Sequence, residues 1–340
     1  MDDLRLTTTS ATIVKAPVKT RPSPLADEVF ALIKRRLPLA SEPLGQAALH
    51  HFHLPGKMLR ARMALATAAA LGINRQVAVF WAASVEVLHN ASLIHDDISD
   101  GDECRRDRPS IWAAFGRDTA LALGDWLIGL AFELASEAAC RSRSPRLVQV
   151  LSRHMLDTTS GQAMEFECHN YPDWDGYTAI TSGKTAPLFI APVEGMAVVA
   201  GREEIINPVT AYFSAVGVAY QIANDILNIL GEDGAENPAS DLIRRAPNAV
   251  IVLYRTLLVG EQSRQFENWL ASEDNRQASS WHRRITASSA VVATAEVMQG
   301  IVDEAERQVS SIPSEIAQVV APVQALLASV CEQSCRSINS

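Results

Sequence analysis

Apolar residues recur at three- and four-residue spacing almost throughout the chain from about Pro24 onward. This period places them on one face of an α-helix, whereas the two-residue alternation typical of half-buried strands is scarce. Short segments rich in Pro, Gly and Asn separate the periodic stretches and mark their ends. The pattern predicts helices over about residues 24–37, 57–71, 75–96, 110–138, 145–167, 175–200, 203–231, 246–259, 285–310 and 313–336.

Some of these helices are apolar on most faces, as in 113–139 and 186–200, which predicts that they are central in the fold. The chain has 340 residues, 48% of them hydrophobic, and can therefore bury a large core. We expect an all-α protein. Its residues 23–340 would form a single large helical bundle with a central active-site cavity, and residues 1–22, rich in Thr and Ser, would form a mobile tail.

Composition narrows the class of partner and the compartment. The net charge of −9 argues against nucleic acid as a partner, because such a protein would present a basic face. The five cysteines form no Cys-x-x-Cys pair, so we expect neither a disulfide framework nor a zinc site. No uninterrupted apolar run reaches about 18 residues, and the start Met1-Asp2-Asp3 is unlike a targeting peptide. We expect a cytoplasmic protein with no stable membrane insertion.

An acidic cluster ends one of the most apolar predicted helices. Asp96 and Asp100 are four residues apart and so share a helix face, with Asp97 beside them. Acids in such a helix are costly unless they are paired or bind a metal. Arg105 and Arg106 follow closely. Carboxylates hold hard divalent cations and arginines hold oxyanions, so the cluster predicts a metal–diphosphate site rather than a solvated acidic helix end.

Two further groups could bind an anion. Lys57 and Arg60 follow Gly56 at a predicted helix start, where they share a helix face. Free N–H groups and the helix dipole favour negative charge there, and two solvated basic residues are the alternative interpretation. His89 precedes Asp96 by seven residues, or about 10 Å along the helix axis. It could donate to a second, deeper anion, although a hydrogen-bonded core histidine is an equally good interpretation.

Polar residues recur in two later apolar segments. Lys184 and Thr185 could offer an ammonium and a hydroxyl group to one phosphate. Asn224, Asp225 and Asn228 supply one carboxylate and two amide oxygens at helical spacing. Such oxygens can hold magnesium, and a buried hydrogen-bond network is the alternative.

In order and approximate spacing these motifs resemble those of the trans-isoprenyl diphosphate synthases of the polyprenyl synthetase family. The resemblance runs from about residue 25 to 260. It implies the isoprenoid synthase fold, a homodimer, and Mg²⁺-dependent condensation of isopentenyl diphosphate with an allylic diphosphate. The matching segments are Gly56-Lys57-x-x-Arg60, Ser92 to Asp100, Arg105-Arg106-x-x-Pro109-Ser110, Gly124-Asp125, Gly161-Gln162, Lys184-Thr185 and Gln221-Ile222.

The resemblance also implies residue roles. Asp96, Asp97, Asp100, Arg105 and Lys184 would carry the chemistry. Metal ligands would be Asp96, Asp100, Asn224, Asp225 and Asn228. The allylic substrate would be bound by Arg105, Lys184, Thr185 and Gln221, and isopentenyl diphosphate by Lys57, Arg60, His89 and Arg106.

Product length depends on the depth of the cavity. Ala91, with its neighbour Ser92, lies five residues before Asp96, or about 7.5 Å deeper on the same helix. Members of the family with short products often have an aromatic residue here as a floor. The small side chain of Ala91 leaves room for a longer tail, so we expect geranylgeranyl diphosphate, with longer chains as an alternative.

The second acidic motif departs from the family pattern. The family has Asp-Asp-x-x-Asp where this chain has Asn224-Asp225-x-x-Asn228. Two lysines that usually follow are replaced by Glu236 and Ala246, and Arg244 or Arg245 could substitute for one of them. The departures fall on the allylic half of the site, while the isopentenyl half is complete.

Three hypotheses remain open. The preferred one is an active synthase, because the complete isopentenyl half makes little sense without that substrate. The second is a class I terpene cyclase, or a prenyltransferase with an acceptor other than isopentenyl diphosphate, since Asn224, Asn228 and Glu232 have the spacing of the cyclase magnesium triad. The third is a non-catalytic regulatory subunit that modulates a partner synthase.

Overall fold

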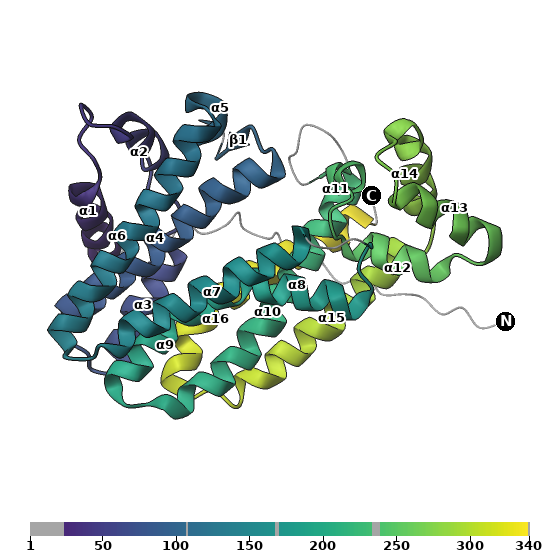
Figure 1. Cartoon of the computed structure of the whole chain (residues 1–340). Helices are drawn as coiled ribbons and strands as arrows, with labels where there is room; N and C mark the ends of the chain where they lie inside the picture. Colours follow the sequence, from purple (N-terminus) through teal and green to yellow (C-terminus); the bar gives the residue numbers. More distant parts are fainter. Residues whose placement is uncertain (1–23, 107, 167–169, 233–238, 339–340) are drawn as a thin grey trace, which may run out of the picture.

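The computed structural model describes residues 24–106, 108–166, 170–232 and 239–338. The predicted tail over 1–22 lies outside these ranges. The described residues form helices with one two-stranded hairpin between them, which confirms the all-α prediction (Figure 1). The α-helices are α1 (Pro24–Arg36), α2 (Gly45–His51), α3 (Leu59–Ala70), α4 (Arg75–Asp100), α5 (Ile111–Phe115), α6 (Arg117–Ser142), α7 (Arg146–Phe166), α8 (Trp174–Thr185), α9 (Pro187–Ala200), α10 (Ile206–Leu230), α11 (Ser240–Arg244), α12 (Ala249–Leu257), α13 (Gly260–Leu270), α14 (Ala278–Thr286), α15 (Ala290–Val309) and α16 (Ser314–Ile338).

Helices α4 and α10 organise the two halves of the bundle. Every residue of α4 from Val77 to Leu88 is buried, and α3 and α6 pack along it. Helix α10 packs against α15, α16 and α8 in the second half (Figure 1). The C-terminal end of α4 reaches α11, because Arg244 of α11 contacts Asp100. The functional residues predicted from sequence gather where these elements meet.

The prediction that fully apolar segments are central is correct for one segment and wrong in part for the other. Every residue of α9 from Pro187 to Val198 is buried. Helix α6, by contrast, buries one face only, and Leu121 on its other face is 42% exposed. An apolar face on the surface predicts contact with something outside the chain.

Several predicted boundaries need correction. Gly116 has φ 88° and splits the segment predicted as 110–138 into α5 and α6. Pro187 occupies the first turn of α9 and separates it from α8, where one helix over 175–200 was expected. The pattern also missed α2, α11, α13 and α14, the strands β1 (Cys104–Arg105) and β2 (Arg108–Pro109), and the 3₁₀ turns η1 (Glu203–Ile205) and η2 (Asn275–Gln277).

Three helices are long and apolar enough to cross a membrane, judged by length and composition alone. They are α4, α6 and α16, and the buried share of the apolar window is 83% in α4, 44% in α6 and 33% in α16. Each of these helices contains polar residues, so none is the uninterrupted apolar run considered in the sequence, and the lack of stable membrane insertion stays a prediction. In α4 the apolar surface is nonetheless used inside the bundle.

Candidate active site

The acidic motif lies in the last turn of α4, which ends at Gly101 with φ 70°. Asp96 is partly exposed, and among the described residues its carboxylate has no ion-pair or hydrogen-bond partner. Burial, together with the charge of Asp100, raises the pKa of Asp96 to about 6, and Lys184 offsets part of this rise. Asp96 and Asp100 therefore face one region together, as their spacing predicts, and Lys184 lies near them.

Asp97 points away from this region. It is 1% exposed, and the guanidinium of Arg105 binds it, with Nε and Nη2 each 2.5 Å from Oδ1. Asp97 and Arg105 were both expected to carry the chemistry, and Arg105 to bind the allylic substrate. The structure joins them as an ion pair between β1 and α4, and their expected roles stay predictions.

The β1–β2 hairpin places Arg106 against the segment that contains Lys57. Arg106 has φ 55°, and its guanidinium packs on Gly56, where a Cβ atom would lie 2.9 Å from Cζ. Two motifs about fifty residues apart in sequence are thus brought together. Helix α3 begins at Leu59, after Met58 with φ 50°, so Lys57 is exposed in the preceding turn. The helix begins two residues later than predicted, so the prediction that Lys57 and Arg60 share a helix face is wrong.

Deeper on the same side of α4, Arg60 and His89 form a buried basic cluster. Arg60 lies 4.4 Å from the ring centroid of Phe189, and its Nε atom is buried without a hydrogen-bond partner. Burial lowers the pKa of Arg60 to about 10, partly offset by Glu86. Burial and the neighbouring arginines hold the pKa of His89 well below its ordinary value. Such a cluster is completed by an anion that satisfies its buried donors.

Glu86 is the counter-charge that sequence reasoning did not single out. It is 4% exposed and accepts a hydrogen bond of 3.0 Å from the backbone N–H of Ala61. Burial raises the pKa of Glu86, and Arg60 lowers it. Its place three residues before His89 could have indicated a shared helix face. Among the described residues, no carboxylate lies within ion-pair distance of Lys57, Arg60 or Arg106.

On the other side of α4, a cleft of about 480 Å³ lies between α4, α7, α8, α10 and α11. Lys184 reaches into it and pairs with Glu165 at 3.0 Å. Gly161 and Gly183 permit the close approach of α7 and α8, since a Cβ atom at Gly161 would lie 2.4 Å from the carbonyl carbon of Gly183. The lining residues are Asp100, Glu165, Ile180, Thr181, Lys184, Thr185, Gln221, Asp241, Arg244, Ala246 and Pro247.

Asp225 is a fully buried carboxylate with three protein donors. Its Oδ2 accepts from the Tyr177 hydroxyl and from the backbone N–H of Ala249, both at 2.7 Å, and its Oδ1 accepts from Gln221 Nε2 at 2.8 Å. Burial and the charge of Asp241 raise the pKa of Asp225 to about 7. This arrangement favours a structural role at the start of α12 over the metal ligation expected from sequence.

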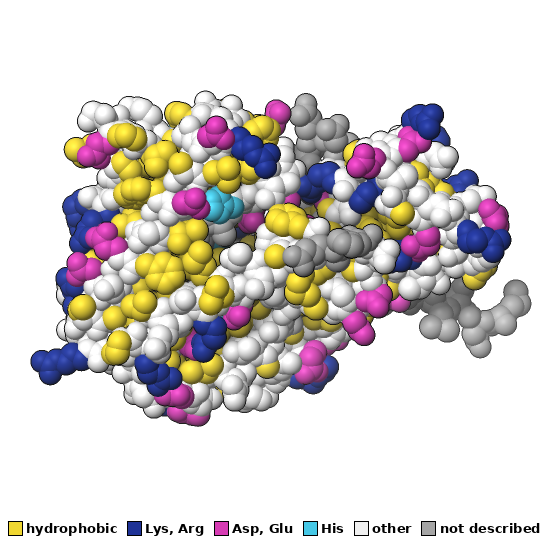
Figure 2. Space-filling view, in the orientation of Figure 1, with side chains coloured by type: hydrophobic (Ala, Val, Ile, Leu, Met, Phe, Trp, Pro, Cys, Tyr) yellow, Lys and Arg dark blue, Asp and Glu magenta, His cyan; other side chains and the backbone are white. Residues whose placement is uncertain are grey.

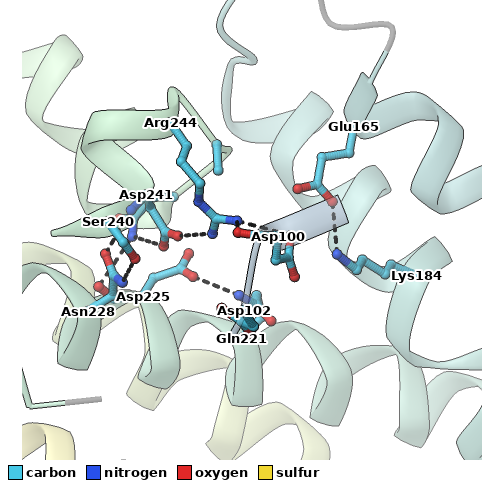
Figure 3. Close-up of polar contacts among 12 residues, drawn as sticks. Asp100, Asp102, Glu165, Lys184, Gln221, Asp225, Asn228, Ser240, Asp241 and Arg244 are labelled. Carbon is cyan, nitrogen blue, oxygen red and sulfur yellow. Dashed lines mark hydrogen bonds and ion pairs between the residues drawn. The ribbon is translucent and has the colours of Figure 1, made fainter. Parts of the chain in front are cut away.

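Asn228 is also committed to the protein. Its Nδ2 donates to Ser240 Oγ at 2.8 Å, and its Oδ1 accepts from the backbone N–H of Asp241 at 3.3 Å. Both contacts anchor α11 on α10 (Figure 3). Asn224 is partly exposed on α10. The interpretation of the second motif as a buried hydrogen-bond network therefore fits Asp225 and Asn228 better than a triple ligand set.

Glu232 does not complete a cyclase-type triad in this structure. Helix α10 ends at Leu230, and Gly231 follows with φ 74°, so the helical spacing stops before Glu232. The Glu232 carboxylate accepts a hydrogen bond from Ser337 of α16. The other position named in the departures from the family pattern, Glu236, lies outside the described residues.

The described residues include no group of three or more His, Cys, Asp or Glu side chains placed to hold a metal ion. Magnesium, however, is commonly bound by one or two carboxylates together with substrate phosphates and water. Asp96, unpaired, and Asp100 beside the cleft fit that pattern. The donor set is all oxygen, which suits a hard divalent cation.

The predicted chain-length residues lie one to two turns deeper on α4. Ala91 is 1% exposed, so its methyl group is enclosed by the bundle. Ser92 is partly buried and its Oγ donates to the carbonyl oxygen of His89 at 2.8 Å. The small side chain at Ala91 is a place where substitution would change the enclosed volume directly.

A helical bundle with an acidic helix end, a basic cluster on one side of it and a cleft on the other has the residue types that suit diphosphate groups accompanied by a divalent cation. A family model described as "Polyprenyl synthetase" matches residues 41–299. The chain therefore belongs to the polyprenyl synthetase family, a family of trans-prenyltransferases.

Curated relatives support this membership. A short chain isoprenyl diphosphate synthase from Methanocaldococcus jannaschii is 30% identical over 227 residues, 66% of this chain and 69% of the relative. A (2E,6E)-farnesyl diphosphate synthase from Mycobacterium tuberculosis is 32% identical over 66% of this chain and 64% of the relative. A geranylgeranyl diphosphate synthase from Saccharolobus solfataricus is 31% identical over 62% and 65%. The match thus spans about two thirds of each relative.

Solved structures show the same fold. A decaprenyl diphosphate synthase from Rhodobacter capsulatus has a TM-score of 0.78 at 24% identity, covering 91% of this chain and 96% of that one. A polyprenyl synthetase from Streptomyces coelicolor has a TM-score of 0.71 at 26% identity, covering 90% and 96%. The predicted isoprenoid synthase bundle is confirmed.

Proposed function

We propose that this protein joins isopentenyl diphosphate to an allylic diphosphate in a Mg²⁺-dependent reaction, with geranylgeranyl diphosphate as the product. One observation carries the proposal. A basic cluster with a buried guanidinium nitrogen that lacks a hydrogen-bond partner on one side of α4, and an acidic, lysine-containing cleft on the other, offer two separate places for diphosphate groups. Relatives named as farnesyl and geranylgeranyl synthases support the reaction. Because their products differ in length, the proposed product length rests on the small, enclosed side chain of Ala91.

The residues divide the work between the two sides. Lys57, Arg60, His89 and Arg106 hold the diphosphate of isopentenyl diphosphate. Among them, the buried Nε of Arg60 lacks a hydrogen-bond partner in the protein, which favours an anion there. Lys184, Thr185 and Gln221 face the allylic diphosphate across the cleft. Asp96 and Asp100 would hold magnesium. When bound, magnesium supplies positive charge that stabilises the departing diphosphate.

The reaction follows from this placement. The allylic C–O bond breaks, and its electron pair leaves with diphosphate, whose charge Lys184 helps to stabilise. The double bond of isopentenyl diphosphate then attacks the allylic carbon, and loss of a proton to the departed diphosphate restores a double bond. The buried apolar side chains of α4 keep water away from the allylic cation, which water would otherwise capture.

The proposed assembly is a homodimer formed through α6 and α7. Hydrophobic side chains gather on this face (Figure 2). Leu121 of α6 is 42% exposed, and Leu156 and Phe166 of α7 are 63% and 62% exposed. A second copy that covers this face would remove that apolar surface from water. Sedimentation of the purified chain would show a monomer if this part of the proposal is wrong.

The proposed location is the cytoplasm. Among the described residues, Cys104, Cys140 and Cys331 are free thiols. Free thiols are typical of a reducing compartment. Recovery of the protein mainly in a washed membrane fraction would contradict both this location and the proposed lack of stable membrane insertion.

The proposal is tested by substitution of the acidic motif. Transfer of label from isopentenyl diphosphate to an allylic primer should occur with Mg²⁺ and be abolished by Asp96→Ala. Asp118→Ala is the matched control, because Asp118 is an exposed aspartate in the first turn of α6. Near-normal turnover by Asp96→Ala would refute the role given to this motif.

A further inference from the structure

Arg244, the last residue of α11, lies in the wall of the cleft opposite Lys184 (Figure 3). Its Nη1 donates to the carbonyl oxygen of Asp100 at 2.7 Å and lies 3.2 Å from Asp100 Oδ1. Its Nη2 donates to Asp241 Oδ1 at 3.0 Å. One guanidinium therefore joins the end of α4 to α11, two segments 144 residues apart.

This position is built by the unusual residue at 228. The Asn228 amide donates to Ser240 and accepts from the backbone N–H of Asp241. A carboxylate at the same place could accept but could not donate to Ser240 in this way. Asn248 Nδ2 completes the anchoring with a hydrogen bond of 3.0 Å to Asp241 Oδ2. The amide at 228 and the arginine at 244 thus belong to one arrangement.

The positively charged side chains of the cleft, Lys184 and Arg244, form ion pairs with carboxylates. Lys184 pairs with Glu165, and Arg244 pairs with Asp100 and Asp241. Arg244 retains 35% side-chain exposure, so its guanidinium is accessible from the cleft. A diphosphate that arrives with a divalent cation brings both signs of charge. It can replace Asp100 as the partner of Arg244 without leaving either group uncompensated.

We propose that Arg244 is a substrate-binding residue of this cleft: its guanidinium exchanges Asp100 for the diphosphate of the allylic substrate and so frees the Asp100 carboxylate for the accompanying cation. The inference rests on the proposed function, since the allylic substrate is the diphosphate concerned. Asp241 stays in contact with Arg244 and keeps the Arg244 guanidinium oriented toward the cleft. A guanidinium suits this exchange because it offers two parallel N–H bonds to phosphate oxygens.

The test compares Arg244→Gln and Arg244→Lys with the unchanged protein. Titration calorimetry measures the affinity for inorganic diphosphate with Mg²⁺, and steady-state kinetics measures KM for each substrate. Arg244→Gln should weaken diphosphate binding by about ten- to a hundredfold, the usual effect of losing a charged hydrogen bond. KM should rise for the allylic substrate and change little for isopentenyl diphosphate. Arg244→Lys should be intermediate, because it keeps the charge and loses the fork.

The matched control is Arg264→Gln, since Arg264 on α13 is 72% exposed and, within the described part of the chain, forms an ion pair only with Glu261 of its own helix. It should leave both measurements unchanged. Unchanged or tighter diphosphate binding by Arg244→Gln would overturn the proposal, as would equal increases in both KM values. If Arg244→Gln does not fold, Arg244→Lys decides, and wild-type diphosphate affinity in that variant would overturn the proposed bidentate contact.

The two proposals can fail separately. If the unchanged protein elongates no primer, the proposed function fails, and calorimetry with diphosphate still decides whether Arg244 binds that anion. If the protein elongates primers but Arg244→Gln has normal KM and normal diphosphate affinity, the function stands and the role of Arg244 is refuted.

Discussion

The guanidinium of Arg105 is bound to the buried carboxylate of Asp97, with two nitrogen atoms 2.5 Å from the same oxygen. This contact gives the middle aspartate of the acidic motif a different task from its neighbours. Asp96 and Asp100 face the region of the cleft, whereas Asp97 holds the hairpin that presents Arg106 to Gly56. The placement of Arg106 on one side of α4 thus depends on an ion pair between the helix and the hairpin.

The first prediction concerns this pair. Asp97→Asn should lower the free energy of unfolding by about 2 kcal/mol. This value lies between those for exposed and for buried ion pairs, because the side chain of Arg105 is 28% exposed and that of Asp97 only 2%. Urea unfolding measures the change. In a double-mutant cycle with Arg105→Gln, the two losses should be strongly non-additive. Additive losses would show that the two residues do not stabilise the fold through each other.

The second prediction uses two glycines with similar backbone angles. Gly56 has φ 63° and Gly72 has φ 68°, so alanine at either position costs about 1 kcal/mol of backbone strain. Only at Gly56 does the new Cβ meet Arg106; at Gly72 nothing lies within 4 Å. Gly56→Ala should therefore raise KM for isopentenyl diphosphate, while Gly72→Ala should lower stability alone. The same KM in both variants would refute the proposed positioning of Arg106.

The third prediction is a pH dependence of stability away from the cleft. Glu194 is 4% exposed; burial alone would raise its pKa, but His154 and Arg153 lower it below the ordinary 4.5. His154 Nε2 lies 2.6 Å from Glu194 Oε2. Because the folded-state pKa is the lower one, this stabilisation is fully present above about pH 4.5 and is lost as the pH falls through the folded value.

Urea unfolding between pH 6 and pH 3 would detect this contribution of Glu194. Glu194→Gln should be less stable than the unchanged protein near pH 6, and the difference should shrink as the pH falls. Glu203→Gln is the matched control, because Glu203 pairs with Arg146 but is 56% exposed. A constant difference between Glu194→Gln and the unchanged protein across the range would contradict the assignment.

The sequence predicts what depends on local pattern. The uniform apolar run of α4 and the Pro-bounded run of α9 determine that both are buried, and the four-residue spacing of Asp96 and Asp100 determines their shared face. The polar helix α13 was missed because its few apolar residues, Phe266, Trp269 and Leu270, give little periodic signal.

The roles of single polar side chains depend on contacts that spacing does not reveal. Asp225 and Asn228 have the spacing of metal ligands, yet their partners come from the starts of α12 and α11, more than ten residues later in the chain. Arg244 was named only as a substitute for a missing lysine. Its contact with Asp100 depends on how α11 folds back over the end of α4.

The fourth prediction concerns product length. Ala91 is enclosed, so Ala91→Phe should fill the space beneath the allylic substrate and shift the product to farnesyl diphosphate. Chromatography of the dephosphorylated products measures the shift. Ala122→Phe is the control, because Ala122 is exposed on α6. An unchanged product with Ala91→Phe would show that the growing chain does not pass this residue.

The most direct test of the whole account is an incubation of the purified protein with Mg²⁺, labelled isopentenyl diphosphate and each allylic primer from dimethylallyl to farnesyl diphosphate. After dephosphorylation, the account predicts a labelled linear twenty-carbon alcohol, which disappears without Mg²⁺ and in Asp96→Ala. A cyclic hydrocarbon without label from isopentenyl diphosphate would indicate a terpene cyclase instead. No turnover of any primer would contradict an active synthase and favour a regulatory subunit.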